Sequence, residues 1–236
     1  MFRRRGLCAR ISTWYTIAAL ISSCNVEIIL SLHMILKAVK KLYPLFIVQF
    51  FTWFALFGLW IYATPIVTRY FFKTTNSESI DFENGTQWVS ACFALYATLA
   101  AFLSFLITWL LKFFSKERLH SLGLIIGSMG LLFIFISRNK WGLMLSFSFI
   151  GIAWSSICNL PYRIVSGLEE EGTNVMVYFA VFNFSVVLPQ IVASFILGFV
   201  NKYLFHNETI YIMLLAGLSM FLAGVLMFIL YPPGKT

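Results

Sequence analysis

The side chains able to bind a small molecule in this sequence are amides, hydroxyls and aromatic rings set within long apolar segments. Amides hydrogen-bond to hydroxyl groups while aromatic rings stack on apolar faces, so this mixture suits an uncharged polyhydroxy ligand. The residues that we expect to line a binding cavity are Trp60, Asn159, Asn183 and Gln190, followed by Ser155, Tyr162, Tyr62 and Tyr96.

Several of these candidates fall on helical stripes. If 141–162 is a helix, Ser155, Asn159 and Tyr162 share one face, because steps of three, four and seven residues return to the same side. Asn183 and Gln190 are also seven residues apart. An unpaired amide in hydrocarbon costs several kcal/mol, so these stripes must face other helices or water. Packing between helices, worth roughly 0.6 kcal/mol per polar contact, stays open as the alternative role.

The apolar segments contain few residues that could catalyse a reaction. No Asp, Glu or Lys lies inside the apolar segments, and the four cysteines lack paired metal-ligand spacing. His120 at a segment edge and His206 in a loop have no nucleophile or metal ligand nearby in sequence, so we expect both to be solvated. We therefore expect no catalytic residue, no metal and no cofactor, and a membrane enzyme is the least favoured function.

The elements that must position the candidates are membrane-spanning helices. Sixty per cent of the 236 residues are apolar and 11% are charged, where a soluble domain has roughly 25% charged residues. Six apolar runs are long enough to cross roughly 30 Å of hydrocarbon as helices. They cover approximately 45–71, 88–111, 119–136, 141–162, 173–200 and 209–231. The predicted fold class is an all-α membrane protein whose first partner is the lipid bilayer.

The distribution of Lys and Arg predicts the orientation. With the N-terminus inside, twelve of the 17 basic residues lie on the inner side and five on the outer side. This bias favours two cytoplasmic termini, with the loops 72–87 and 201–208 outside. The net charge of +8 belongs to this topology, and the basic residues form no continuous face for nucleic acid.

Residues 1–41 form a separate expectation. The apolar stretch 11–23 has 13 residues, too few to span, and extending it would bury Asn25, Glu27 and His33. We interpret 1–41 as a cytoplasmic or interfacial segment and 42–236 as the six-helix domain. A secretory signal that ends before Cys24 is the alternative, although it would place Lys37, Lys40 and Lys41 outside.

Polar residues are sorted among the helices. The segments 119–136 and 209–231 contain few hydrogen-bonding side chains, but each contains a pair of small residues four positions apart. These pairs are Gly123 with Gly127 and Ser219 with Ala223, and they predict close approach between helix backbones. We expect these two helices to brace the four helices that contain the polar candidates.

Three sequence blocks resemble a known family. Residues 49–65 (QFFTWFALFGLWIYATP), 151–167 (GIAWSSICNLPYRIVSG) and 177–190 (VYFAVFNFSVVLPQ) resemble the seventh, tenth and eleventh helices of the sucrose/proton symporters. These belong to the glycoside–pentoside–hexuronide:cation symporters within the major facilitator superfamily. The resemblance covers roughly 42–231. It implies the C-terminal half of a major facilitator fold, built from two three-helix inverted repeats.

The resemblance implies a cation-coupled sugar carrier present as a half-length chain. The family's coupling carboxylate lies in the other half, so this chain is not expected to transport alone. It implies a small sugar as substrate and a second six-helix half, or a second copy, as partner. The alternative is a non-transporting truncated or split-gene membrane protein that needs a partner half. The loop 112–120 (KFFSKERLH) departs from the family's gating turn, which leaves a gating role for Lys116 or Arg118 in doubt.

Overall fold

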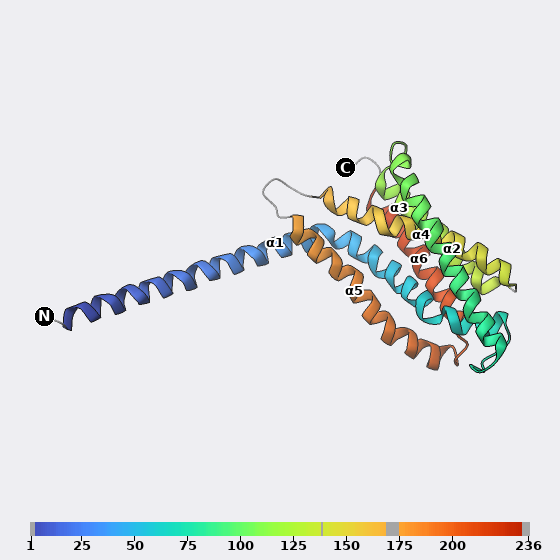
Figure 1. Cartoon of the computed structure of the whole chain (residues 1–236). Helices are drawn as coiled ribbons and strands as arrows, with labels where there is room; N and C mark the ends of the chain where they lie inside the picture. Colours follow the sequence, from blue (N-terminus) through green and yellow to red (C-terminus); the bar gives the residue numbers. More distant parts are fainter. Residues whose placement is uncertain (1–2, 138, 169–174, 233–236) are drawn as a thin grey trace.

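The computed structural model describes residues 3–137, 139–168 and 175–232, with side chains from residue 31 onward. The described elements are helices α1 to α6, bundled together except for the start of α1 (Figure 1). Each contains a segment long and apolar enough to cross a membrane, which confirms the predicted fold class. The helices are α1 Arg3–Ile66, α2 Ile80–Leu110, α3 Lys116–Ile136, α4 Lys140–Ser166, α5 Val175–Phe199 and α6 Ile210–Leu230. Short π-helical turns, Val67–Phe71 and Val200–Leu204, follow α1 and α5.

Side-chain caps set the starts of α2, α3 and α4. Ser79 accepts a hydrogen bond from the Phe82 backbone N–H at 3.2 Å, and Ser115 and Asn139 cap α3 and α4 in the same way. Helix α2 begins eight residues before the expected position 88, because its capped first turns are polar. The length of an apolar run predicts only the part of a helix that lies in hydrocarbon. Polar turns that continue the helix outside the hydrocarbon are not predicted by it.

The N-terminal segment is a continuation of α1. The helix runs from Arg3 to Ile66 without a break at position 41, and its first part projects away from the bundle (Figure 1). Lys41 Nζ donates to the Leu168 carbonyl at 2.9 Å, which ties α1 to the residues after α4 where the helix joins the bundle. The cytoplasmic or interfacial location of residues 1–41 stays a prediction.

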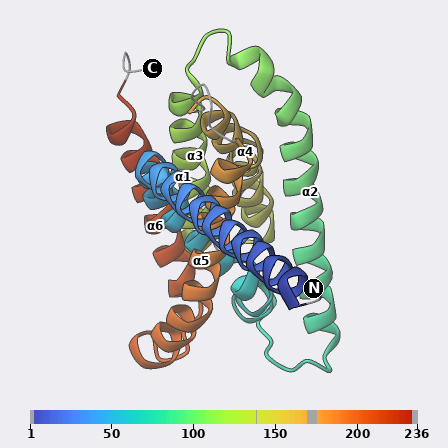
Figure 2. The ribbon, with the colours of Figure 1, turned by 90° about the vertical axis from the view of Figure 1, so that its left-hand side faces the viewer.

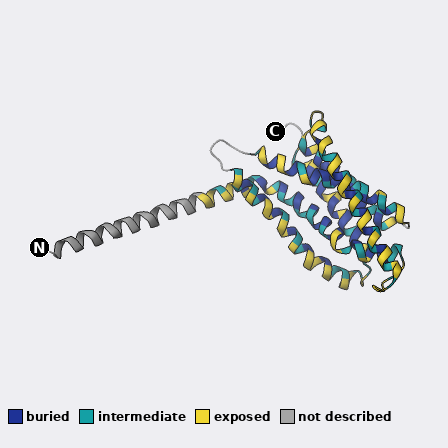
Figure 3. Cartoon of the chain, in the orientation of Figure 1, coloured by how far each residue is buried: buried dark blue, intermediate teal, exposed yellow. Residues whose placement is uncertain are grey.

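The helix pairs repeat between the two halves of the chain. Helix α1 packs on α5 and α6, α4 packs on α2 and α3, and α3 packs on α6. Exchanging the first three helices for the last three reproduces every one of these pairs, as the predicted three-helix repeats require. Helix α2 lies along one flank of the bundle (Figure 2). In the most apolar part of α2 and α5, 22% and 28% of residues are buried, against half or more in the other four helices (Figure 3).

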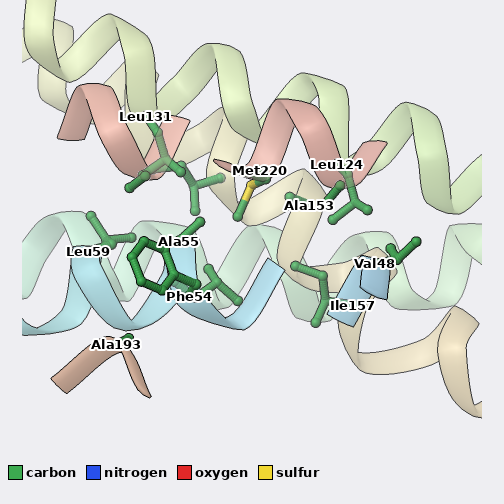
Figure 4. Packing of buried hydrophobic residues seen from close by; sticks show 14 of the residues in the cluster. Val48, Phe54, Ala55, Leu59, Leu124, Leu131, Ala153, Ile157, Ala193 and Met220 are labelled. Carbon is green, nitrogen blue, oxygen red and sulfur yellow. The ribbon is translucent and has the colours of Figure 1, made fainter. Parts of the chain in front are cut away.

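Glycines bring α3 against α4 and α6. A methyl group at Gly123 would lie 2.7 Å from the Ser156 Cβ, and one at Gly127 would overlap the Ala153 methyl. Ala153 and Met220 are both fully buried beside this crossing (Figure 4). The expected role of the Gly123 and Gly127 pair is therefore confirmed, since only a residue without Cβ permits this approach.

Serine hydroxyls join α3 to α6 and α6 to α1. Ser121 donates to the Gly224 carbonyl at 2.7 Å, and Ser219 donates to the Phe51 carbonyl at 2.9 Å. His120 is fully buried, and its Nδ1 lies 2.7 Å from the Ser156 hydroxyl. The prediction of a solvated His120 is wrong, because α3 begins at Lys116 and turns this ring toward α4. His206 is exposed, as expected.

A polar clasp closes one end of the bundle, joining the turn after α1 to the residues before α6. Arg69 Nη1 donates to the Asn207 carbonyl at 2.8 Å, and Nη2 donates to Glu208 Oε1 at 2.7 Å. The Tyr70 hydroxyl donates to the other oxygen of the same carboxylate. We call Arg69, Tyr70 and Glu208 the end clasp.

We expect Gly127→Ala to lower the free energy of unfolding by about 1–3 kcal/mol, because the added methyl forces α3 away from α4. Gly198→Ala is the matched control, since nothing lies within 4 Å of a methyl group there. It should be neutral or stabilise by up to about 1 kcal/mol. Denaturant titration of both variants in detergent micelles measures the difference. Equal stabilities would contradict the proposed importance of the α3–α4 crossing.

Candidate functional site

Four aromatic side chains from three helices meet in the bundle. Trp53 and Trp60 come from α1, Tyr96 from α2 and Trp154 from α4, and we call them the aromatic cluster. The Trp154 ring centroid lies 6.0 Å from Trp53, 5.6 Å from Trp60 and 5.7 Å from Tyr96. The Tyr96 and Trp154 rings are stacked, and the tryptophan pairs meet edge to face.

The cluster lies near the middle of the spanning segments. Tyr96 and Trp154 are each within one residue of the midpoint of their helices. The backbones of α1 and α4 hardly approach each other, so the tryptophan rings bridge the space between these helices. Gly151 positions Tyr96, because a Cβ on Gly151 would lie 2.9 Å from the Tyr96 carbonyl oxygen. The cluster thus stands near the middle of the apolar spans of these helices.

Polar atoms at the cluster lack partners. Trp53 Nε1 is buried without a hydrogen bond, and so is Gln49 Oε1 one helical turn away on α1. The Tyr96 hydroxyl lies beside Trp60, whose indole N–H can only donate to it, so the Tyr96 O–H is also a donor without an acceptor. Buried polar groups are usually paired, because an unpaired one loses its hydration without compensation. Two donors and an acceptor are therefore free for water or a polar ligand beside aromatic rings.

The structure brings together two of the predicted site residues, Trp60 and Tyr96. Trp60 is 36% exposed at the edge of the cluster, whereas Tyr96 is buried inside it. Tyr62 is half-buried on α1 and makes no ring contact or hydrogen bond with a described residue. Trp60 is accordingly the most exposed ring of the aromatic cluster.

The α4 candidates Ser155 and Asn159 bind within the protein. The Asn159 amide donates to Ser104 Oγ on α2 at 3.0 Å and to the Ser155 carbonyl at 2.7 Å. The Ser155 hydroxyl is buried and donates to the Ile152 carbonyl at 2.9 Å. These bonds give both residues a packing role, and a ligand contact at either one stays a prediction.

The remaining candidates lie apart from the cluster. Tyr162 is exposed on α4, and its ring contacts Phe179 and Phe182 of α5. The Gln190 amide donates to the carbonyl of Val186 in its own helix at 3.1 Å. Asn183 is exposed on α5 and makes no hydrogen bond with a described residue. Asn183 is thus the α5 candidate whose amide still requires a polar neighbour.

Sequence reasoning missed Trp53 and Trp154 as site residues. Trp53 shares one helical face with Trp60, and Trp154 lies in the sequence block 151–167. The candidates on α4 were chosen along a stripe of hydroxyl and amide side chains. Trp154 does not fall on this stripe of Ser155 and Asn159. Their joining in space depends on the α1–α4 separation, which no single helix pattern encodes.

The surroundings of the cluster are uncharged. The described parts of α1 from Tyr43 to Thr68 and of α4 from Trp141 to Tyr162 contain no charged side chain. A nearby groove of about 360 Å³ between α1 and α5 is walled almost entirely by apolar side chains, including Phe50 and Leu188. The unpaired polar atoms therefore make the cluster, and not this groove, the better site for a polar ligand.

Comparison with known proteins identifies the fold. No family model and no curated protein matches the sequence. Among solved structures, the chain is similar to a mutant of the peptide transporter POT in complex with sulfate, with a TM-score of 0.60 and 20% identity. The match covers 80% of this chain and 37% of that transporter chain. The six helices therefore have the fold of part of a transporter of the major facilitator type, as predicted. An identity of 20% does not indicate which substrate this chain binds.

We expect the Asn159–Ser104 hydrogen bond to contribute about 0.6 kcal/mol to stability, with about 1.7 kcal/mol as an upper bound. A double-mutant cycle with Asn159→Ala, Ser104→Ala and the double variant isolates this coupling energy. Denaturant titration in micelles provides the four free energies. The pair Asn159→Ala and Ser194→Ala is the control and should show no coupling, because Ser194 bonds only its own helix. Coupling near zero for the first pair would contradict the packing role.

Proposed function

We propose that this chain forms one six-helix wall of a membrane carrier for a small uncharged polar solute, and that the solute binds at the aromatic cluster. The observation that carries the proposal is the set of unpaired polar atoms, including Trp53 Nε1, among stacked aromatic rings near mid-membrane depth. Rings bind the apolar faces of a solute, while free donors and acceptors bind its hydroxyl groups.

Within this proposal, a sugar is the preferred solute class. A peptide carries charged termini, and each charge moved into hydrocarbon requires an opposite charge beside it. The central parts of α1 and α4 offer none, so a disaccharide fits this wall better than a dipeptide. The likeness to a peptide transporter at 20% identity concerns the fold. The sucrose symporter resemblance of residues 49–65, 151–167 and 177–190 supports the same solute class.

The proposal includes a partner surface opposite the cluster. Trp60 and Asn183 are exposed on this chain, and an unpaired amide cannot rest against lipid without cost. A second six-helix half, or a second copy of this chain, would supply the facing wall and the groups that couple transport to a cation. A non-transporting chain that only binds such a partner is the alternative, and it would leave the aromatic cluster without a ligand.

Solute binding by the purified chain, measured by tryptophan fluorescence, tests the proposal. Trp60→Ala and Trp154→Ala should each weaken disaccharide binding about tenfold, which corresponds to about 1.4 kcal/mol of lost stacking. Trp141→Ala is the control, because Trp141 lies exposed at the start of α4 and should leave affinity unchanged. A dipeptide should bind weakly to every form. The sugar proposal fails if the dipeptide binds and the disaccharide does not, or if Trp60→Ala binds sugar normally.

The proposed orientation can be tested by cysteine labelling. In a variant with all four native cysteines replaced, Glu78→Cys should react with an impermeant thiol reagent in intact cells. Lys112→Cys should react only after the membrane is opened. Both positions are exposed, so accessibility in the folded chain does not distinguish them. The reverse pattern would place the termini outside.

A further inference from the structure

Two hollows meet at the end of the bundle where α2 and α4 end and α3 begins. The first has a volume of about 460 Å³ and is lined by Lys116, Glu117, Arg163 and two serines. The second is a groove of about 490 Å³ between α3 and α6, walled by Leu122, Ile125, Val225 and Phe228. Phe114 lines both. We call them the cationic hollow and the apolar groove, and their volumes fall in the range of ligand sites.

Three cationic side chains are among the described residues that line these hollows. Lys116 Nζ donates to the Arg163 carbonyl at 3.1 Å, and Arg163 Nη2 donates to Thr108 Oγ1 at 3.4 Å. Arg118 is exposed and lines the apolar groove. Among the described residues, no carboxylate forms a salt bridge with any of these three cations. Each retains donors for an anion, since lysine has three and arginine five.

Glu117 is the carboxylate that lines the cationic hollow, and it is 5% exposed. Its charge acts on Tyr231, where burial and then the Glu117 carboxylate raise the pKa of the tyrosine to about 12. Among the described residues that line the two hollows, three cations and one carboxylate leave two positive charges. An anion is therefore the complementary ligand for this end.

The apolar groove indicates that the anionic ligand also has an apolar part. Leu122 is 46% exposed and Phe228 is 56% exposed, so the outer faces of α3 and α6 beside the groove meet the hydrocarbon of a bilayer. Arg118 precedes Leu122 by one helical turn and stands toward the helix end, where lipid headgroups lie. A free phosphate would bind the cations and leave the apolar groove empty. A phospholipid would bind the cations with its headgroup and fill the groove with an acyl chain.

We propose that this end binds one anionic phospholipid from the surrounding leaflet. The headgroup phosphate lies on Lys116, Arg118 and Arg163, and one acyl chain lies in the apolar groove between α3 and α6. Basic pockets between membrane helices bind anionic headgroups in this way. The site is separate from the aromatic cluster and does not depend on transport of any solute.

Native mass spectrometry of the purified protein, titrated with phosphatidylglycerol or phosphatidylcholine, tests the proposal. Wild type should retain one phosphatidylglycerol at least about tenfold more tightly than phosphatidylcholine. Lys116→Gln with Arg118→Gln and Arg163→Gln should abolish this preference. The matched control removes three cations at the opposite end, with Lys73→Gln, Lys140→Gln and Lys202→Gln, and should keep it.

Two further variants test the proposal if the triple variant does not fold. Leu122→Trp fills the apolar groove without changing charge, and it should weaken phosphatidylglycerol binding several-fold. Glu117→Gln removes the opposing carboxylate and should strengthen it. Inorganic phosphate is the competing anion. The proposal is overturned if both lipids bind equally, if the triple variant retains the preference, or if phosphate displaces the lipid and binds wild type and Leu122→Trp alike.

Discussion

The close approach of α3 to α4 and α6 is the contact on which the bundle depends. In hydrocarbon, helices gain little from burying apolar surface against each other, so association requires backbones near enough for dense packing. Gly123 and Gly127 provide this against α4, and Gly224 provides it against α6, where a Cβ would meet the Ile125 side chain at 2.8 Å. With α3 and α6 joined in this way, α4 and α1 each pack on one of them and stand on either side of the aromatic cluster.

That arrangement explains how polar groups are distributed. Hydroxyls within the α3, α4 and α6 contacts are paired, as the Ser121 to Gly224 and His120 to Ser156 bonds show. Between α1 and α4 the backbones stay apart, and there the Trp53 Nε1–H and the Tyr96 O–H have no acceptor. At the α3–α4 contact His120 Nε2 is also buried without a partner, but the hydroxyls there are paired, whereas between α1 and α4 two donors are left without acceptors.

Apolar length made the six helices predictable, because a bilayer requires about 20 apolar residues for each crossing. Small residues four apart likewise predicted the α3 crossing at Gly127. The burial of His120 and the start of α2 at Ile80 could not be read in the same way. Both features depend on polar residues that continue a helix beyond the hydrocarbon. The length of an apolar run does not predict how far such residues extend the helix. At the site, Trp60 and Tyr96 were found as single residues, but their meeting with Trp154 depends on helix spacing in three dimensions.

The end clasp has a mechanical consequence. Arg69 and Tyr70 leave the end of α1 and both bind the one carboxylate of Glu208, just before α6 begins. Helix ends tied at a common point cannot move independently, so a tilt of α1 acts on α6 of the opposite repeat and, through the α3–α6 packing, on α3 of its own repeat. A load on the end of one of these two helices is thereby shared with the end of the other.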